Sequence, residues 1–268
     1  MNIHSPFRLL LGLTIVVSAI DAKAGEVAPL PHAHSHNDYL HTRPLLDALD
    51  HGFNSVEADI FFIDGKLLVA HVRGDVKPER TLEALYLEPL KKRINENGGR
   101  VFKNGPRFML LIDLKSKPEP TFAALQKVLT KYANMLTTVE KGKVREGAVT
   151  IVISGERPEL DANDKGARYV GLDGRPADLA STLPAHFMPM ISDSWSNQFK
   201  WKGDGDMPPK EKAKLKKMVD QAHAAGRVLR FWATPEKEPV WQELQTVGVD
   251  LINTDELARL EAFLRKAD

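Results

Sequence analysis

The feature that most constrains the fold is a repeated alternation of short apolar runs with segments of helical periodicity. Eight runs have the length and composition of buried strands, and each is followed by a helix-like segment. The predicted strands are Leu30–His34, Ser55–Phe62, Phe108–Leu114, Ala148–Ile153, Arg168–Leu172, Phe187–Ile191, Val228–Trp232 and Val249–Ile252. The predicted helices are Thr42–Leu49, Thr81–Ile94, Thr121–Leu136, Asp178–Thr182, Lys210–Ala225, Pro239–Val247 and Glu256–Lys266, with a short one in Arg157–Lys165. This pattern predicts an α/β fold, a single (β/α)8 TIM-type barrel, with an open doubly wound sheet as the alternative.

The N-terminus has the pattern of a secretory signal peptide. Arg8 precedes a mostly apolar, uncharged stretch, Leu9–Ile20, and Ala22-Lys23-Ala24 supplies a small-x-small cleavage site. The stretch is shorter than the roughly 20 residues that a spanning helix needs, which favours a cleaved signal over an uncleaved anchor. We therefore expect residues 1–24 to be a signal peptide, residues 25–268 to form the barrel domain, and the mature protein to be secreted or periplasmic.

Charge and cysteine content exclude several classes of function. The 268 residues include 37 Lys and Arg against 36 Asp and Glu, and without residues 1–24 the two counts are equal. A neutral chain has no global field to hold nucleic acid, and we expect at most peripheral membrane contact and no protein partner. The chain has no cysteine, which excludes disulfides, thiolate catalysis and cysteine-built metal sites.

Two acids lie on one face of the second predicted strand. Glu57 and Asp59 point to the same side because side chains alternate along a strand, and the residues between and around them are apolar. In a barrel the apolar side faces the helices, so the acids face the lumen, where bare carboxylates would repel each other. A divalent cation, Mg²⁺ or Ca²⁺, removes that conflict because both ions prefer oxygen ligands. The alternative is a solvated outer face with two ordinary acids.

The third predicted strand repeats this arrangement at its C-terminal end. Asp113 and Lys115 share one face of the strand. Asp113 could complete the metal site, and Lys115 could neutralise an anion of the substrate. The alternative for this pair is a simple ion pair.

Histidines are concentrated near these acids. Four of the nine lie at the first predicted strand: His32, His34, His36 and His41. His71 ends the ribbon Leu67–His71, which a tight turn at Gly65 is predicted to form. Two histidines that reach a carboxylate cluster suit general acid–base catalysis, because their pKa lies near the operating pH. The ends of the strands converge at the C-terminal face, where barrel enzymes place their active sites.

At these residues the sequence resembles a known superfamily, the phospholipase C-like phosphodiesterases. Ser35–Leu40 is similar to the box that opens the catalytic barrel of phosphoinositide phospholipases C. Glu57-x-Asp59 followed by His71 resembles the pattern that the superfamily shares with glycerophosphodiester phosphodiesterases and sphingomyelinase D enzymes. Further similar segments are Asp113-Leu114-Lys115, Arg230-Phe231-Trp232-Ala233-Thr234 and Gly248–Asp255. The resemblance covers about residues 30–260 and is nearest to the branch named after altered inheritance of mitochondria proteins.

The resemblance implies roles for individual residues. It implies a phosphoric diester hydrolase that uses one divalent cation, Mg²⁺ or Ca²⁺, on a small-molecule or lipid phosphodiester, such as a phospholipid or its deacylated headgroup. His36 and His71 would be the acid–base pair, and Lys115 and Trp232 would contact the phosphate and the leaving-group or lipid side. The implied metal ligands are Glu57, Asp59, Asp113 and Asn37. The chain departs from the glycerophosphodiesterases, which usually carry Arg where Asn37 stands and insert a subdomain after the second strand.

Two other functions fit parts of the pattern. A metal-dependent amidohydrolase or phosphoesterase barrel would use a His-x-His pair on the first strand, either His32 with His34 or His34 with His36. Such an enzyme would also need histidines at the ends of strands five and six. A non-catalytic lipid-binding barrel could retain the site as a relic. Trp195, Phe199 and Trp201 could form an apolar lip for a lipid tail or, equally, a packed loop.

Overall fold

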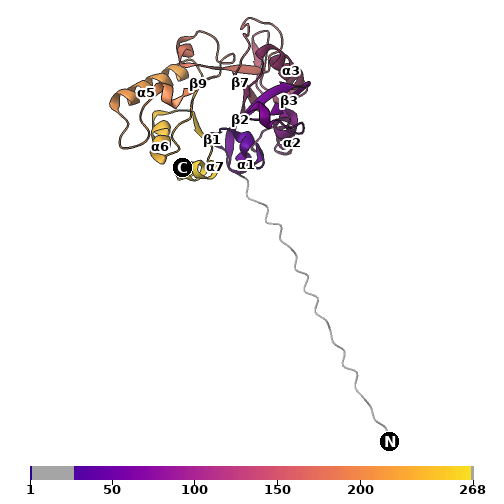
Figure 1. Cartoon of the computed structure of the whole chain (residues 1–268), viewed down its shortest axis with the longest axis horizontal. Coiled ribbons are helices and arrows are strands. Elements are labelled where there is room, and N and C mark those ends of the chain that lie inside the picture. The colour runs from indigo at the N-terminus through magenta and orange to yellow at the C-terminus, as the bar shows by residue number, and fades with distance from the viewer. Residues whose placement is uncertain (2–26, 267–268) are drawn as a thin grey trace.

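The computed structural model describes Met1 and residues 27–266. Of the predicted signal peptide, residues 2–24 therefore lie outside the described part of the chain. Within that part, eight parallel strands close into a barrel, because the first strand pairs with both the second and the last (Figure 1). Around the barrel the order is β1 (Leu30–Ser35), β2 (Phe53–Ile63), β4 (Phe108–Leu114), β7 (Val149–Gly155), β8 (Val170–Gly174), β9 (Met190–Ser194), β10 (Val228–Trp232) and β11 (Leu251–Thr254). The predicted (β/α)8 barrel is confirmed and the open sheet is excluded.

The helices lie around the outside of the strands (Figure 1). They are α1 (Leu46–Asp50), α2 (Glu88–Glu96) after a π-helical turn at Glu83–Leu87, α3 (Pro118–Thr130), α4 (Trp195–Gln198), α5 (Pro209–Ala224), α6 (Glu238–Val247) and α7 (Leu257–Leu264). Local signals in the sequence explain several boundaries. The Thr81 hydroxyl accepts a hydrogen bond from the Ala84 amide at 3.1 Å, and Gly226 follows α5 with a φ of +68°. No helix within residues 27–266 has the length and apolarity needed to cross a membrane.

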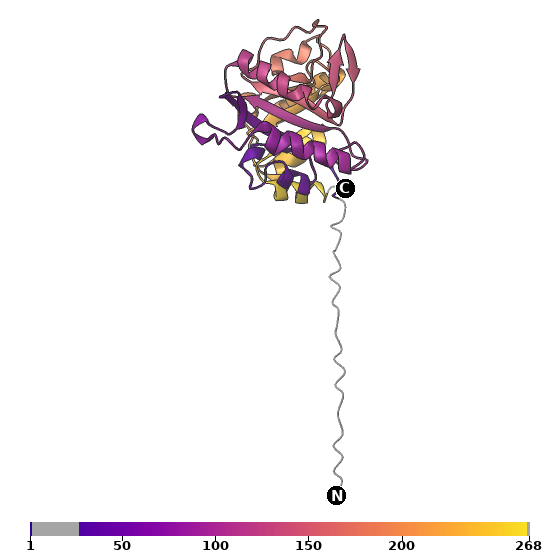
Figure 2. The ribbon, with the colours of Figure 1, turned by 90° about the vertical axis from the view of Figure 1, so that its right-hand side faces the viewer.

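Hairpins extend the barrel at two places. Strand β3 (Lys66–Val69) returns antiparallel to β2 through a turn at Asp64 and Gly65, both with positive φ, as the sequence predicts. The hairpin of β5 (Thr138–Glu140) and β6 (Lys143–Arg145) was not predicted from the sequence. The beginning and the end of residues 27–266 lie close together, because the Arg265 guanidinium donates to the Ala28 carbonyl at 3.1 Å; the C-terminus is marked in Figure 2.

Two of the predicted helices are wrong in detail. Arg157–Lys165 contains no helix, because Pro158 and an Asx turn at Asp161 direct the chain into turns. The segment predicted at Asp178–Thr182 is a short 3₁₀ helix at Pro176–Ala180, which begins at the proline.

The apolar lip suggested for the aromatic loop is also wrong. Trp195 and Phe199 are each 3% exposed, and Trp201 is also buried. The rings of Trp195 and Phe199 pack against Phe231, which points outward from β10. Burial of such large apolar rings is strongly favourable, so the three aromatic residues belong to the core between barrel and helices.

The lumen of the barrel is divided into two layers. Its lower layer is a small apolar cluster of Leu111, Val152, Met190 and Leu251. Above it, towards the C-terminal ends of the strands, the lumen side chains are mostly polar or charged. The apolar layer closes the barrel from below, so that a cavity can open only at the C-terminal face, as in other barrels of this type.

Candidate active site

Three carboxylates from neighbouring strands meet at the top of the lumen. Glu57 and Asp59 alternate on β2 with residues that are fully buried on the helix side, as predicted. Asp113 on β4 lies opposite Asp59 in the strand register. One oxygen from each of the three carboxylates lies within 4.8 Å of the others. The sequence prediction that these acids face the lumen is therefore confirmed.

Each carboxylate has one oxygen bound by the protein and a second one without a hydrogen bond inside the described chain. Glu57 Oε2 accepts from Arg230 at 2.6 Å, and Asp59 Oδ2 accepts from the Tyr39 hydroxyl at 2.7 Å. Lys115 Nζ lies 3.2 Å from Asp59 Oδ2 and 3.0 Å from Asp113 Oδ2. By contrast, Oδ1 of Asp59 and Oδ1 of Asp113 are buried with no partner. Unpartnered buried carboxylate oxygens are costly, and together they match the oxygen ligands of a hard divalent cation.

The electrostatics of the cluster agree with this geometry. Burial and the neighbouring Glu57 raise the pKa of Asp59 to about 6. Burial also raises the pKa of Asp113, although Lys115 opposes the effect. Burial would raise the pKa of Glu57 as well, but Arg230 and His34 hold it below its ordinary value. Three acids therefore share too few positive charges, and a divalent cation would stabilise all three in the ionised form.

Gly155 at the end of β7 makes room for one of these carboxylates. Its φ is +71°, and a Cβ at this position would overlap Oδ1 of Asp113. Position 155 therefore favours glycine for two reasons: its backbone has a positive φ, and a side chain there would collide with Asp113. The absence of a side chain at Gly155 leaves room for Oδ1 of Asp113.

His36 is oriented by an acid from the far end of the chain. Its Nδ1 lies 2.8 Å from Oδ1 of Asp255, which also accepts from the Asn37 amide at 3.2 Å. Burial opposes ionisation of Asp255, but the hydrogen bond from His36 lowers its pKa below the ordinary value. Because Nδ1 donates to Asp255, Nε2 of His36 is left for proton transfer.

His71 is oriented through a tyrosine. Its Nδ1 lies 2.9 Å from the Tyr39 hydroxyl and 3.4 Å from Oδ2 of Asp59. The same hydroxyl lies 2.6 Å from Oδ1 of Asn37, so Tyr39 connects the two histidine-bearing segments. With Nδ1 held by Tyr39, Nε2 of His71 is the nitrogen left for chemistry.

All of the predicted site residues line one cavity of about 390 Å³ at the C-terminal face of the barrel. They are His36, Asn37, Glu57, Asp59, His71, Asp113, Lys115 and Trp232. Trp232 is 39% exposed at the rim, while Asp59 is 1% exposed. Lys115 pairs with Asp113, which was the alternative interpretation for this strand. Because Lys115 also lines the cavity, the ion pair is compatible with a role towards an anion. The oxygen of the Asn37 side chain lies 2.6 Å from the Tyr39 hydroxyl, and its role as a metal ligand stays a prediction.

Comparison with known proteins agrees with this arrangement. Residues 22–170, more than half of the chain, match the AIM6-like phosphodiesterase domain. The chain belongs to the AIM6-like phosphodiesterase domain family. It is 28% identical to the altered inheritance of mitochondria protein 6 homolog of Arthroderma benhamiae, over 88% of this chain and 84% of that protein. It is 26% identical to altered inheritance of mitochondria protein 6 of Candida glabrata, over 93% of this chain and 75% of the relative.

Solved structures show the same fold. A glycerophosphodiester phosphodiesterase from Parabacteroides distasonis matches with a TM-score of 0.51 and 12% identity, over 90% of this chain and 99% of that one. A glycerophosphodiester phosphodiesterase from Agrobacterium tumefaciens matches with a TM-score of 0.52 and 16% identity, over 88% of this chain and 100% of the other. At such identities the likeness establishes the TIM-barrel fold of this AIM6-like domain.

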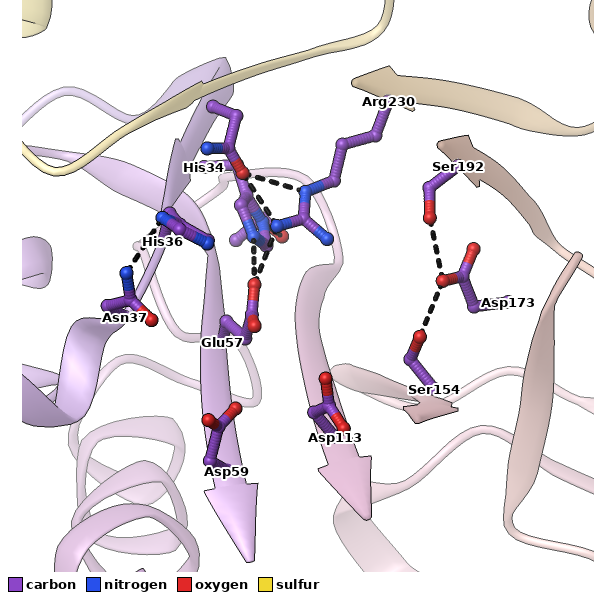
Figure 3. Close-up of polar contacts among 12 residues, drawn as sticks. His34, His36, Asn37, Glu57, Asp59, Asp113, Ser154, Asp173, Ser192 and Arg230 are labelled. Atoms are coloured by element: carbon purple, nitrogen blue, oxygen red, sulfur yellow. Dashed lines mark hydrogen bonds and ion pairs between the residues drawn. The ribbon is translucent and has the colours of Figure 1, made fainter. Parts of the chain in front are cut away.

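Sequence reasoning missed several polar residues of the AIM6-like site. Arg230, Tyr39 and Asp255 were part of the quoted motifs but were given no role. Arg230 is 3% exposed, binds Glu57 and Asn253, and lines the cavity (Figure 3). Alternation along β10 places Arg230 on the same face as Trp232, and that signal could have found it.

The His-x-His alternative has little support in this AIM6-like barrel. His32 is exposed and lies against the Asp250 carbonyl, whereas His34 is buried, with Nδ1 beside Ser55 and Nε2 3.6 Å from Glu57. Burial and the Arg230 charge lower the pKa of His34 to about 3. In the described part of the chain, the group of side chains that could hold a metal contains the three acids and no histidine.

Proposed function

We propose that this protein is a metal-dependent phosphoric diester hydrolase in which His36 and His71 transfer protons. The observation that carries the proposal is that three carboxylates with free oxygens and two oriented histidines face one cavity. The AIM6-like phosphodiesterase domain supports phosphodiesterase chemistry in general. The structures of glycerophosphodiester phosphodiesterases support the fold on which that chemistry would be built.

Glu57, Asp59 and Asp113 would hold one Mg²⁺ or Ca²⁺, with Asn37 as a further candidate ligand. When bound, the cation would withdraw negative charge from the phosphoryl oxygens. Lys115 would add a second positive charge to the phosphate from the same wall of the cavity. The two protein cations, Lys115 and Arg230, each hold one oxygen of the acids that they contact, which restrains the orientation of those carboxylates.

The histidines would act on the two ends of the reacting phosphodiester. One Nε2 would take the proton of the attacking hydroxyl or water, and the other would give a proton to the leaving oxygen. Asp255 would keep His36 in its orientation, and Tyr39 would do the same for His71. Whether the attacking group is water or a hydroxyl of the substrate depends on the substrate, because cyclisation needs a neighbouring hydroxyl in line with phosphorus.

The substrate class follows from the cavity and from the predicted export of the chain. We propose a small-molecule or lipid phosphodiester, with Trp232 on the leaving-group side. We also propose that residues 1–24 direct the protein out of the cytoplasm, to the periplasm or the medium, and that it needs no protein partner. Nucleic acid is not expected as a substrate because the chain has no excess of positive charge.

The deciding experiment is a turnover screen with and without chelator. It would use glycerophosphodiesters, lysophospholipids, phosphatidylinositol, sphingomyelin and a chromogenic bis-phosphodiester. We expect turnover that depends on Mg²⁺ or Ca²⁺ and that falls roughly 10²–10⁴-fold in His36→Ala and in His71→Ala. His51→Ala is the matched control, because His51 also pairs with an acid, Glu261, but does not line the cavity.

Three results would count against the proposal. If no diester is turned over with either cation, the protein would be a binding barrel with a relic site. If His36→Ala and His71→Ala keep the rate of the His51→Ala control, the site would not use these histidines. Tightly bound zinc or iron would favour the amidohydrolase-type alternative.

A further inference from the structure

A second polar cluster lies in the lumen, on β7, β8 and β9, and takes no part in the proposed chemistry. Oδ2 of Asp173 accepts hydrogen bonds from the hydroxyls of Ser154 and Ser192, both at 2.7 Å (Figure 3). The same oxygen accepts from Nη1 of Arg175 at 2.6 Å. Nη2 of Arg175 also donates to the Ser154 hydroxyl at 3.2 Å. Three side chains, one from each of these strands, thus fix one guanidinium group.

Only the arginine of this cluster carries its charge to the surface of the cavity. Asp173 and Ser192 are each 1% exposed, and Ser154 is also buried. The Arg175 side chain is 37% exposed and lines the same cavity as the acids and histidines. Nε of Arg175 has no hydrogen-bond partner within the described chain. The guanidinium is therefore held rigidly and still has an N–H group to offer.

The cluster is expected to contribute little to the stability of the fold. One layer below, the same strands fill the lumen with apolar side chains such as Val152 and Met190. A buried ion pair is often no more stable than well-packed apolar residues of the same volume, and removal of one partner leaves an uncompensated charge. Packing alone does not explain why Asp173 and two serines lie at this level of the lumen. The need to position Arg175 would explain them.

A second arginine adds positive charge at the same place. The Arg157 guanidinium donates to the Asp173 carbonyl, to which Nη1 of Arg175 also donates at 3.4 Å. Burial and the charge of Arg175 lower the pKa of Arg157, although Asp173 and Asp178 oppose the effect. Two guanidinium groups that share one carbonyl oxygen repel each other, and an anion beside them would relieve that repulsion.

We propose that Arg175 forms a second, anion-binding subsite, which takes a negatively charged group of the substrate other than the scissile phosphodiester. This inference rests on the proposed function and narrows the substrate class to phosphodiesters that carry a further phosphate or carboxylate. In the order of the eight barrel strands, β8 lies opposite β1, which precedes His36. The second anionic group would therefore lie across the cavity from His36. Arg175 is a binding residue here, and Asp173 is its positioning residue.

The test compares two p-nitrophenyl phosphodiesters that share the leaving group. In one the second alcohol is ethanol, and in the other it is a propanediol with a phosphate monoester at its far end. With Mg²⁺ or Ca²⁺ present, we expect the intact chain to prefer the doubly anionic substrate. Arg175→Gln should lower kcat/KM for that substrate about 10-fold or more, mainly through KM, and change the ethyl substrate less than about 3-fold. Arg175→Lys should restore part of the difference.

The matched control is Arg107→Gln, because Arg107 pairs with Glu146 and does not line this cavity. Binding of propanediol monophosphate, measured by calorimetry in EDTA, gives a readout that does not depend on turnover. We expect Arg175→Gln to weaken this binding about 10-fold relative to Arg107→Gln. Circular dichroism would check that each variant is folded.

The outcomes separate the two proposals. Equal losses on both substrates, or no preference in the intact chain, would overturn the subsite. Absence of turnover together with Arg175-dependent binding would overturn the proposed function and support the subsite. If inorganic phosphate binds as tightly as propanediol monophosphate and inhibits the ethyl substrate without competing with it, the arginine would serve a free anion, and the substrate subsite would be wrong.

Discussion

On one side of the lumen, Asp59 and Asp113 lie beside a third acid and share one lysine between them. On the other side, Asp173 has an arginine and two hydroxyls on a single oxygen. Both arrangements bury carboxylates at the same level of one barrel. The first, the acidic half, has more acids than neighbouring cations and would be completed by the proposed metal ion. In the second, the arginine half, one aspartate faces one arginine, which we propose it positions. In all three aspartates Oδ1 is buried without a hydrogen-bond partner in the described chain. The balance of charge around the carboxylates, and not their burial or an unpartnered oxygen, therefore distinguishes the two arrangements.

Of the variants that test this comparison, Gly155→Ala is expected to change stability and cation binding the most. The new Cβ requires a strained backbone at a φ of +71° and overlaps Oδ1 of Asp113, so it damages the acidic half alone. We expect a loss of about 3 kcal/mol in the free energy of unfolding, measured in urea with cation present, and loss of cation binding.

Gly142→Ala is the control for this variant. Gly142 has a φ of +73° with open space around it, so it should lose only about 1 kcal/mol from backbone strain. Equal losses in both variants would mean that Gly155 is not needed to make room for Asp113.

Addition of cation is expected to stabilise the acidic half by the next largest amount. At a concentration of Mg²⁺ or Ca²⁺ 100-fold above the Kd, the free energy of unfolding should rise by about 2.7 kcal/mol, which EDTA should reverse. For a chain of this size the melting temperature should rise by about 5–10 °C. Asp59→Asn and Asp113→Asn should abolish the shift. A shift that persists in both variants would place the cation elsewhere.

Asp173→Asn should affect the arginine half of the lumen and leave cation binding in the acidic half unchanged. The variant keeps the shape of the side chain but removes the charge that Arg175 faces, and we expect a loss of about 2 kcal/mol in urea unfolding. The cation-induced rise in melting temperature should remain, in contrast to Asp113→Asn. If Asp173→Asn also abolishes the rise, the two halves are not independent.

The smallest effect is expected from Ser192→Ala. It removes one of the donors on Oδ2 of Asp173 and leaves the arginine in place. We expect a loss of about 1 kcal/mol in the free energy of unfolding. A loss as large as that of Asp173→Asn would mean that the Ser192 hydroxyl contributes as much to stability as the charge of Asp173 does.

Much of the fold was predictable from the sequence, because strand and helix patterns are local. Phe108–Leu114 and Val228–Trp232 are strands over their full predicted length. The aromatic loop shows where local reasoning failed. Trp195 and Phe199 are equally compatible with an exposed lip and a packed loop, and only their contact with Phe231 decides between the two.

For the site, the sequence by itself determined which residue types alternate on each strand and which motifs they form. That was enough to predict that the three acids, His36 and His71 lie together, because the strands of a parallel barrel all end at one face. Only the tertiary structure decided which oxygen of each carboxylate is bound. It also decided that Asp255 holds His36 and that Asp173 holds Arg175, and it brought Arg230 to Glu57. The physical reason is that these pairs join strands far apart in the chain, so their distances depend on how the barrel closes and on no local pattern.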